Sequence, residues 1–168
     1  MREMRLKDRM LTEEEAMDVV RKGEYGVLST VGEDGKPYAV PPSYVLDEEK
    51  KVIYFHGTAA GGQKMDNILA NPSVCFTVVR NTEVLPSQFS TKYYSASVFG
   101  TAKVVEEEEE KKKALLLLVR KYSPEVRGLG LGLGVQPLRG GLWRSGVYTG
   151  GGIEPSALSW PGESVASS

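Results

Sequence analysis

Short runs of apolar and polar residues alternate from residue 25 to residue 105, and this pattern predicts a mainly antiparallel β-structure. Asp34 followed by Gly35 is a hairpin-turn signal, and the polar residues 47–51 mark a second turn. Closely spaced strands with tight turns favour an antiparallel meander that is closed or packed as a barrel. The predicted strands cover residues 25–31, 37–46, 52–56, 74–79 and 94–105.

Two positions interrupt the strand pattern. Pro41 and Pro42 lie inside the second predicted strand and lack the N–H groups that a ladder needs, so we expect an edge or a bulge there. Between the fourth and fifth strands, Asn81, Pro86 and Ser87 predict a loop.

Three segments carry helical signals. Thr12 and Glu15 match a capping box ahead of a short apolar stripe, and Gly23 is placed to end that helix. Residues 63–70 predict a short helix that stops at Asn71 before a proline. Residues 107–122 predict a longer helix, in which the pairs Glu107 with Lys111, Glu108 with Lys112 and Glu109 with Lys113 have the favourable i,i+4 order.

The composition changes near residue 127. Residues 128–168 hold 11 of the 19 glycines but only 4 of the 43 charged residues. We therefore assign residues 1–126 to one folded domain and residues 127–168 to a Gly/Ser/Pro-rich C-terminal segment. That segment carries one possible last strand, near residues 143–160, and a disordered end.

Overall composition limits the function classes. The 168 residues carry a formal net charge of −1, which offers no broad basic surface for nucleic acid or an anionic membrane. No long apolar run or leader-like segment is evident, and we expect a cytoplasmic protein. One cysteine and one histidine exclude an internal disulfide, a cysteine-rich zinc site and a histidine-rich metal site, so no metal is expected.

Residues 54–64 run from a strand through a glycine-rich loop into a helix, which is anion-binding geometry. Lys64 adds a full positive charge and Thr58 a hydroxyl donor. A P-loop is excluded because Gln63 stands where that motif needs lysine; when the register is shifted to use Lys64, Met65 replaces the magnesium-binding hydroxyl. The glycines at 128–134 do not fit a dinucleotide-binding fingerprint either. Spacing alone leaves open a phosphate site or an idle turn.

Other candidate residues have ordinary explanations as well. His56, at the end of its strand, could contact a cofactor or donate a proton, or be a half-buried strand residue bonded to a carbonyl. Cys75 lies in an apolar run and is expected to be an inert core residue. Tyr93 and Tyr94 could stack on a planar ring, although ordinary packing explains them equally well.

Several motifs in order give the chain a family resemblance. Residues 24–30, 35–44, 53–57, 64–68, 71–76, 89–95, 99–102 and 121–124 resemble the pyridoxamine-phosphate-oxidase-like flavin proteins, and most closely their nitroimidazole-resistance branch. The likeness covers about residues 8–125. It departs from the branch in two places: the loop before Gln63 is one residue longer, with Gln63 where histidine is frequent, and the chain beyond Val126 does not match.

The resemblance implies an α+β split β-barrel homodimer with flavin mononucleotide (FMN) in a cleft between subunits. Matching positions imply that the phosphate is held by Gln63 and Lys64 with Thr58, and that the isoalloxazine lies along Ala39, Val40 and Pro41. Further implied cofactor contacts are His56, Gly57, Thr58 and Ala59 beneath the ring, and Tyr93 and Ser95, the last two approaching from the partner subunit.

The implied activity is that of an FMN-dependent oxidoreductase, in which the flavin carries the electrons and His56 is the one candidate proton donor. Small nitroaromatic or quinone-like acceptors and a reduced nicotinamide donor are the expected reactants. The alternative is a non-enzymatic flavin- or haem-binding carrier or sensor.

Overall fold

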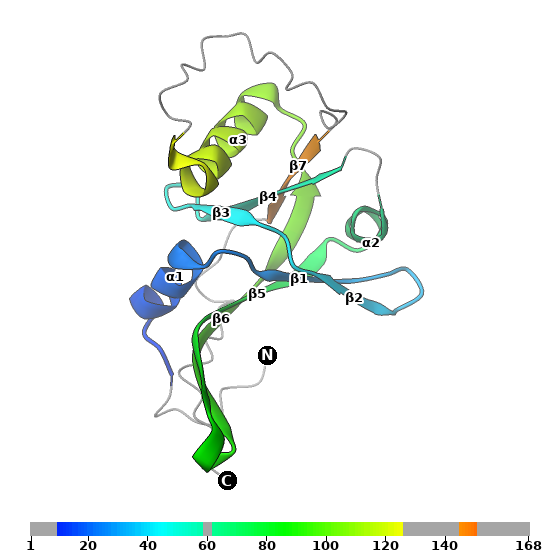
Figure 1. The fold of residues 1–168 in the computed structure, drawn as a ribbon. Coiled ribbons are helices and arrows are strands. Elements are labelled where there is room, and N and C mark those ends of the chain that lie inside the picture. Colours follow the sequence, from blue (N-terminus) through cyan, green and yellow to red (C-terminus); the bar gives the residue numbers. More distant parts are fainter. Residues whose placement is uncertain (1–9, 59–61, 126–144, 151–168) are drawn as a thin grey trace.

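The computed structural model describes residues 10–58, 62–125 and 145–150. In chain order these residues form the following elements: α1 (Glu13–Lys22), β1 (Val27–Val31), β2 (Pro37–Val40), β3 (Tyr44–Asp47), β4 (Val52–Thr58), α2 (Gln63–Ala70), β5 (Ser73–Leu85), β6 (Ser90–Val104), α3 (Glu108–Tyr122) and β7 (Ser145–Gly150). All the strand pairings are antiparallel. The predicted mainly β architecture with flanking helices is therefore confirmed (Figure 1).

The strands form one seven-stranded sheet in the order β2-β1-β5-β6-β7-β4-β3. β6 joins the two halves, since it pairs with β5 along most of its length and with β7 through residues 102–104. The two ends of the sheet meet where Tyr25 bridges Ser43 and the Gly26 N–H donates to the Pro42 carbonyl at 3.3 Å. This arrangement is a split barrel closed near Pro42.

Two sequence predictions need correction here. The strand expected over residues 37–46 is two strands, β2 and β3, because Pro41 and Pro42 end the ladder and carry the chain to the other half of the barrel. For the same reason the first strands are not a meander: β2 and β3 follow one another in sequence but lie at opposite ends of the strand order.

The β5–β6 hairpin is the most extended part of the described chain, and its tip projects away from the barrel (Figure 1). A loop was expected from Asn81 onward, but β5 continues to Leu85 and only Pro86–Gln88 form a short 3-10 turn. The ladder register shifts between Arg80 and Glu83, so the polar residues there form a bulge within a strand.

Helix α1 begins as the sequence predicts. The Thr12 hydroxyl accepts the Glu15 N–H at 3.3 Å, while the Thr12 N–H donates to the Glu15 carboxylate at 2.7 Å. Gly23 ends the helix in an extended conformation with φ −63°, not in the left-handed region. A glycine is required there for packing, because an added Cβ would lie 2.4 Å from the Val78 side chain.

Helix α3 has a different charge pairing from the one expected. The Glu107 carboxylate accepts the backbone N–H groups of Glu109 and Glu110 and so caps the helix instead of pairing with Lys111. Lys111 and Lys112 pair at i,i+3 with Glu108 and Glu109. Lys113 binds Asp47 of β3 at 2.6 Å, which helps to fix α3 on that half of the barrel.

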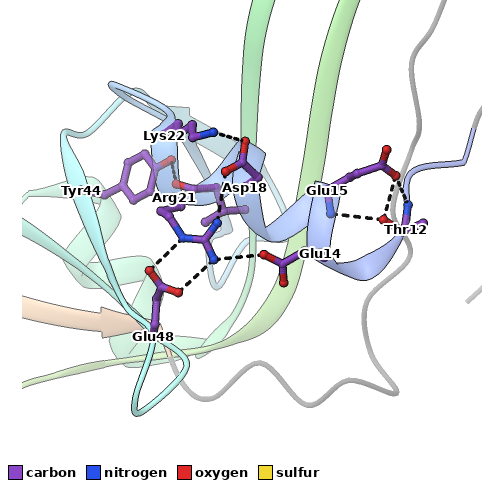
Figure 2. A network of polar contacts seen from close by, with 9 residues as sticks. Thr12, Glu14, Glu15, Asp18, Arg21, Lys22, Tyr44 and Glu48 are labelled. Carbon is purple, nitrogen blue, oxygen red and sulfur yellow. Dashed lines mark hydrogen bonds and ion pairs between the residues drawn. The ribbon is translucent and has the colours of Figure 1, made fainter.

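Two apolar clusters form the core. The larger fills the barrel beneath α1, with Tyr44, Phe55 and Phe76 at its centre. The smaller lies under α3 and consists of Val45, Tyr54, Val105, Ala114 and Leu118. The Tyr44 hydroxyl is buried and donates to the Val20 carbonyl, so an aromatic ring in the barrel also anchors the end of α1 (Figure 2).

Lys121, near the end of α3, carries a buried ammonium without a hydrogen-bond partner among the described residues. Its Nζ lies 3.9 Å from the centre of the Tyr44 ring. Burial, assisted by the charge of Arg80, lowers the Lys121 pKa from 10.5 to about 8. At neutral pH the charged side chain therefore costs stability, and the attraction to the ring face offsets part of that cost.

We expect Lys121→Met to raise the free energy of unfolding by about 1 kcal/mol at pH 7, since methionine keeps the volume and removes the charge. The lysine amine is charged below pH 10.5 in the unfolded chain, but only below about pH 8 in the folded chain. The gain in unfolding free energy from Lys121→Met is therefore full below pH 8 and vanishes above pH 10.5. Urea denaturation at pH 7 and pH 10 measures both values. An equal difference between the two proteins at both pH values would contradict the explanation.

The C-terminal segment is described only at residues 145–150, which form β7 and pair with β4 and β6. Of the segment predicted to carry a last strand, near 143–160, only these six residues are described; residues 151–160, the expected disordered end and the 126–144 stretch lie outside the described residues. In the described part of the chain, no helix combines the length and apolar character that crossing a membrane requires.

Candidate functional site

The amino end of α2 has the geometry of an anion site. Gly62, the N-cap, has φ +139° and offers no side chain to cap the helix, and a Cβ added to it would meet no atom within 4 Å apart from its chain neighbours. The first turn of a helix presents N–H groups that need an acceptor. An uncapped first turn beside open space is therefore suited to a phosphate.

Lys64 lies in that first turn. Its Nζ is 5.9 Å from the centre of the Phe55 ring, and Phe55 precedes His56 on β4. Partial burial lowers the pKa of the Lys64 amine from its ordinary value. A desolvated positive charge interacts more strongly with an anion than a fully hydrated one does.

A chain of hydrogen bonds fixes α2 to the first hairpin. The Gln63 amide donates to the Asn67 side chain at 2.8 Å, Asn67 donates to the Thr30 hydroxyl at 2.9 Å, and Thr30 donates to the Tyr38 carbonyl at 3.2 Å. Asn67 and Thr30 are almost completely buried, so these bonds are shielded from water. The chain couples the position of α2 to β2, the strand that ends at Val40.

The predicted site residues fall into three groups. Ala39, Val40 and Pro41 lie at the end of β2, with Ala39 and Pro41 exposed; His56 is exposed on β4; Gln63 and Lys64 begin α2. Lys64 over Phe55 connects α2 to β4, and the hydrogen bonds from Asn67 to Thr30 of β1 and from Thr30 to Tyr38 connect α2 to β2. Gly57 and Thr58 are described only as backbone in β4, and Ala59 lies outside the described residues.

Tyr93 and Ser95 do not join this group within one chain. Phe99 marks the point on β6 that lies in the same cross-strand row as Ala39, and Ser95 is four residues, or about 13 Å, further along the strand. The strand register nevertheless puts them on the same face of the sheet. One row of opposed residues crosses the four strands, in the order Ala39, Ser29, Cys75 and Phe99. Further along the hairpin, on the same face, Ser95 lies opposite Val79. Since strand residues alternate between faces, Ala39, Ser95 and Tyr93 all lie on the outer face of the β2-β1-β5-β6 half of the sheet.

This outer face carries small polar side chains that the sequence analysis did not single out. Thr77 and Ser97 are 3.0 Å apart, and Cys75 lies 3.7 Å from Thr77. Cys75 is half-buried on this face, so its expected place in the apolar core is wrong. The signal was the alternation of Cys75 and Thr77 with Val74, Phe76 and Val78, which an apolar count over the strand conceals.

The assembled site is suited to binding a flat, phosphate-bearing molecule. It offers an uncapped helix end and a lysine at one side, and an exposed strand end with small side chains at the other. His56 is the single imidazole of the chain. These residues provide position and charge but no nucleophile with its base, which points to a bound cofactor as the source of any redox chemistry.

Comparisons with known proteins agree with this arrangement. The family model described as pyridoxamine 5'-phosphate oxidase matches residues 12–129. A 5a,11a-dehydrotetracycline/5a,11a-dehydrooxytetracycline reductase of Streptomyces rimosus is 40% identical over 60 residues, which is 35% of this chain and 42% of the relative. The chain thus matches less than half the length of that relative.

Two solved structures show the same fold. A candidate 5-nitroimidazole antibiotic resistance protein of Bacteroides thetaiotaomicron has a TM-score of 0.61 at 18% identity, over 90% of this chain and 81% of the other. An FAD and haem binding protein of Mycobacterium smegmatis has a TM-score of 0.66 at 18% identity, over 92% of this chain and 82% of the other. With the family model spanning more than half of its residues, the chain belongs to the pyridoxamine 5'-phosphate oxidase family.

Proposed function

We propose that the protein binds FMN and uses it to reduce small acceptors. The observation that carries the proposal is the uncapped amino end of α2, with Lys64 in its first turn, beside the strand that bears His56. FMN ends in a phosphate monoester, which matches one lysine and one helix end.

In this proposal each group of residues has one task. Lys64 and the first-turn N–H groups of α2 hold the phosphate, and Thr58 assists. The Gln63 side chain is already bonded to Asn67, so we assign it mainly to fixing the helix, with Lys64 as the principal anchor. Ala39, Val40 and Pro41 border the ring, and His56 to Ala59 run beneath it. A bound flavin would supply the redox chemistry, and His56 would serve as the proton donor to the reduced acceptor.

Two relatives support the proposed class of acceptor. One relative is a reductase of dehydrotetracyclines, which are polycyclic conjugated carbonyl compounds, and one structural neighbour is a candidate nitroimidazole resistance protein. We therefore propose quinone-like or nitroaromatic acceptors with a reduced nicotinamide as donor. Because that donor is intracellular, the proposal also assigns the protein to the cytoplasm.

Spectroscopy and steady-state kinetics test the proposal. The purified full chain should show flavin absorption, or gain it on incubation with FMN, and should oxidise NADH or NADPH when menadione or a nitroimidazole is present. A colourless protein that takes up no FMN would contradict the whole proposal. Flavin uptake without nicotinamide oxidation would contradict the reductase part alone and favour a carrier.

We further propose a homodimer, with FMN between subunits. Three exposed apolar side chains lie along the hairpin, Val79 at 48%, Val84 at 67% and Phe89 at 96% of their full exposure. Tyr93 and Ser95 lie too far along the hairpin to complete the site of their own chain. A partner covering the outer face of β2-β1-β5-β6 would bury these apolar groups and bring its own Tyr93 and Ser95 to the cofactor.

Phe89→Asp should weaken this dimer by about tenfold or more, because an aromatic anchor is replaced by a charge. Phe89 has φ +49°, a conformation that aspartate adopts more readily than most residues, so the hairpin tip should keep its shape. Light scattering across a dilution series measures the dimer, with Glu83→Ala on the same hairpin as the control. A monomeric parent protein would contradict the dimer, and an unchanged dimer in Phe89→Asp would contradict its proposed contact.

A second candidate function is a non-enzymatic flavin or haem carrier. The favouring observation is the fold shared with an FAD and haem binding protein. Haem titration tests the haem carrier: a Soret band that is lost in His56→Ala would favour haem binding, whereas FMN uptake that excludes haem would contradict it.

A further inference from the structure

A second hollow lies on the opposite face of the β5–β6 hairpin, against α1. One cavity of about 400 Å³ is lined by α1 residues together with Arg80, Asn81 and Tyr94. A smaller one of about 290 Å³ lies against Lys22, Glu24 and Thr82 and shares Arg80 and Asn81 with the first. The two cavities meet at Arg80 and Asn81, which line both of them, and we refer to them together as the groove.

This groove is separate from the proposed flavin site. Arg80 pairs with Tyr94 across the ladder, one position along from the Val79–Ser95 pair. Alternation along a strand therefore places Arg80 and Tyr94 on the α1 side and Ser95 on the outer side. A ligand bound between Arg80, Tyr94 and Val19 in the larger cavity would not touch the row that contains Ala39 and Ser95, whereas the smaller cavity also reaches Val79 of that row.

Arg80 has no ion pair or hydrogen bond from its guanidinium to any described residue. The acids of α1 that line the same groove are already occupied, as Figure 2 shows. Asp18 binds Arg21 at 3.1 Å and Lys22 at 2.8 Å, and Glu14 lies 3.6 Å from Arg21. Glu15 is held by Thr12 in the capping box. The acids of α1 thus provide no counter-ion for Arg80, and Glu24, which lines the smaller cavity with it, makes no ion pair with it either.

A second cation, Lys121 of α3, interacts electrostatically with Arg80. The Lys121 ammonium is buried and has no hydrogen-bond partner among the described residues, and the charge of Arg80 adds to the burial that lowers its pKa. An anion beside Arg80 would offset part of this repulsion. Lys121 does not line the groove, so its positive charge would attract the bound anion only at a distance.

The bulge adds donors at the same place. The ladder register shifts after Arg80, and Asn81 has φ +51°, so the strand departs from regular pairing at the floor of the groove. Thr82 brings a hydroxyl to the smaller cavity. Val19 and Tyr94 give the larger cavity an apolar wall.

We propose that this groove binds a small organic carboxylate, with its acid group on Arg80 and its apolar body against Val19 and Tyr94. A planar guanidinium binds a carboxylate through two parallel hydrogen bonds, which suits an arginine at the junction of the two cavities. The bound anion would tie α1 to the root of the hairpin. The site would therefore regulate the rigidity of the hairpin and take no part in electron transfer.

Benzoate tests the proposal, with benzamide as the neutral probe of the same shape. Benzoate should raise the melting temperature of the full chain saturably and bind measurably by calorimetry, while benzamide should not. Arg80→Gln should weaken benzoate binding by about tenfold or more. Lys64→Ala should leave benzoate binding unchanged, because the flavin phosphate site is separate.

Three results would overturn the proposal: no response to benzoate, an equal response to benzamide, or equal benzoate binding in Arg80→Gln. Benzoate binding that is lost in Lys64→Ala would also overturn it, by assigning the anion to the flavin site. Should Arg80→Gln fold poorly, Lys121→Met serves as the second variant. This variant keeps Arg80 and should be more stable than the parent when free, but it should bind benzoate several-fold more weakly because one positive charge is lost. An unchanged affinity for benzoate would contradict the proposed contribution of Lys121 to binding.

Discussion

Lys64→Ala should weaken FMN binding by about 10–100-fold, or about 1–3 kcal/mol, the range for losing a charge-assisted hydrogen bond. The effect is expected at the upper end of this range because the Lys64 amine is partly desolvated, as its lowered pKa indicates. The Gln63 side chain is bonded to Asn67 and offers little compensation. Quenching of FMN fluorescence on titration with protein gives the dissociation constant.

Two matched variants complete this experiment. Lys64→Arg keeps the charge and should retain most of the affinity. Lys36→Ala removes a lysine that is 82% exposed and paired with Asp34 at the hairpin turn, and should leave FMN binding unchanged. An unaltered dissociation constant in Lys64→Ala, with a normal melting temperature, would mean that the phosphate binds elsewhere. Equal losses in Lys64→Ala and Lys36→Ala would indicate a general charge effect.

Local signals predicted the helices and most strands. The capping box at Thr12, the stop at Asn71 and the Asp34–Gly35 turn each act within a few residues, and all three are found. Local chemistry also singled out the candidate site at α2, because a glycine-rich loop and a lysine in the first turn are adjacent in sequence.

The errors arose where partners are far apart in sequence. The two prolines at 41–42 signal an interruption, but only the whole sheet shows that the chain crosses there to the other half of the barrel. Asn81 signals a turn, yet β6 supplies a pairing partner on both sides of it, and the result is a bulge. That Arg80 makes no ion pair with a described residue could not be found from sequence, because this depends on which partners Asp18 and Glu14 bind.

The same dependence on distant contacts makes Gly26 a sensitive position. Gly26 is buried just before β1, and an added Cβ would lie 2.3 and 2.5 Å from two atoms of the Phe76 ring and 3.1 Å from the Thr77 carbonyl. The ring cannot easily move away, since it packs edge-on against Tyr44 at 4.9 Å and lies parallel to Phe55 at 6.5 Å. Room for this ring explains the glycine.

Gly26→Ala should therefore lower the free energy of unfolding by about 2–3 kcal/mol, the upper part of the usual range for overpacking. Urea denaturation measures the loss, and Glu33→Ala, an exposed change on the neighbouring hairpin, should stay within about 0.5 kcal/mol of the parent. In the double variant with Phe76→Leu, the free energy of unfolding should fall by about 1 kcal/mol less than the sum of the two single losses, because the smaller side chain accommodates the methyl group. Strict additivity would show that the ring is not the cause.

The FMN affinity of Gly26→Ala distinguishes an effect of core packing on the site from the direct binding of the phosphate by Lys64. The Gly26 N–H closes the barrel on the Pro42 carbonyl, next to Pro41, and Phe76 contacts Phe55, which lies beneath Lys64. A strained ring would displace both borders of the proposed flavin site at once. FMN affinity should fall in Gly26→Ala and recover in part with Phe76→Leu, whereas the loss in Lys64→Ala should not respond to Phe76→Leu. A recovery in both would mean that Lys64 acts through packing and not through its charge.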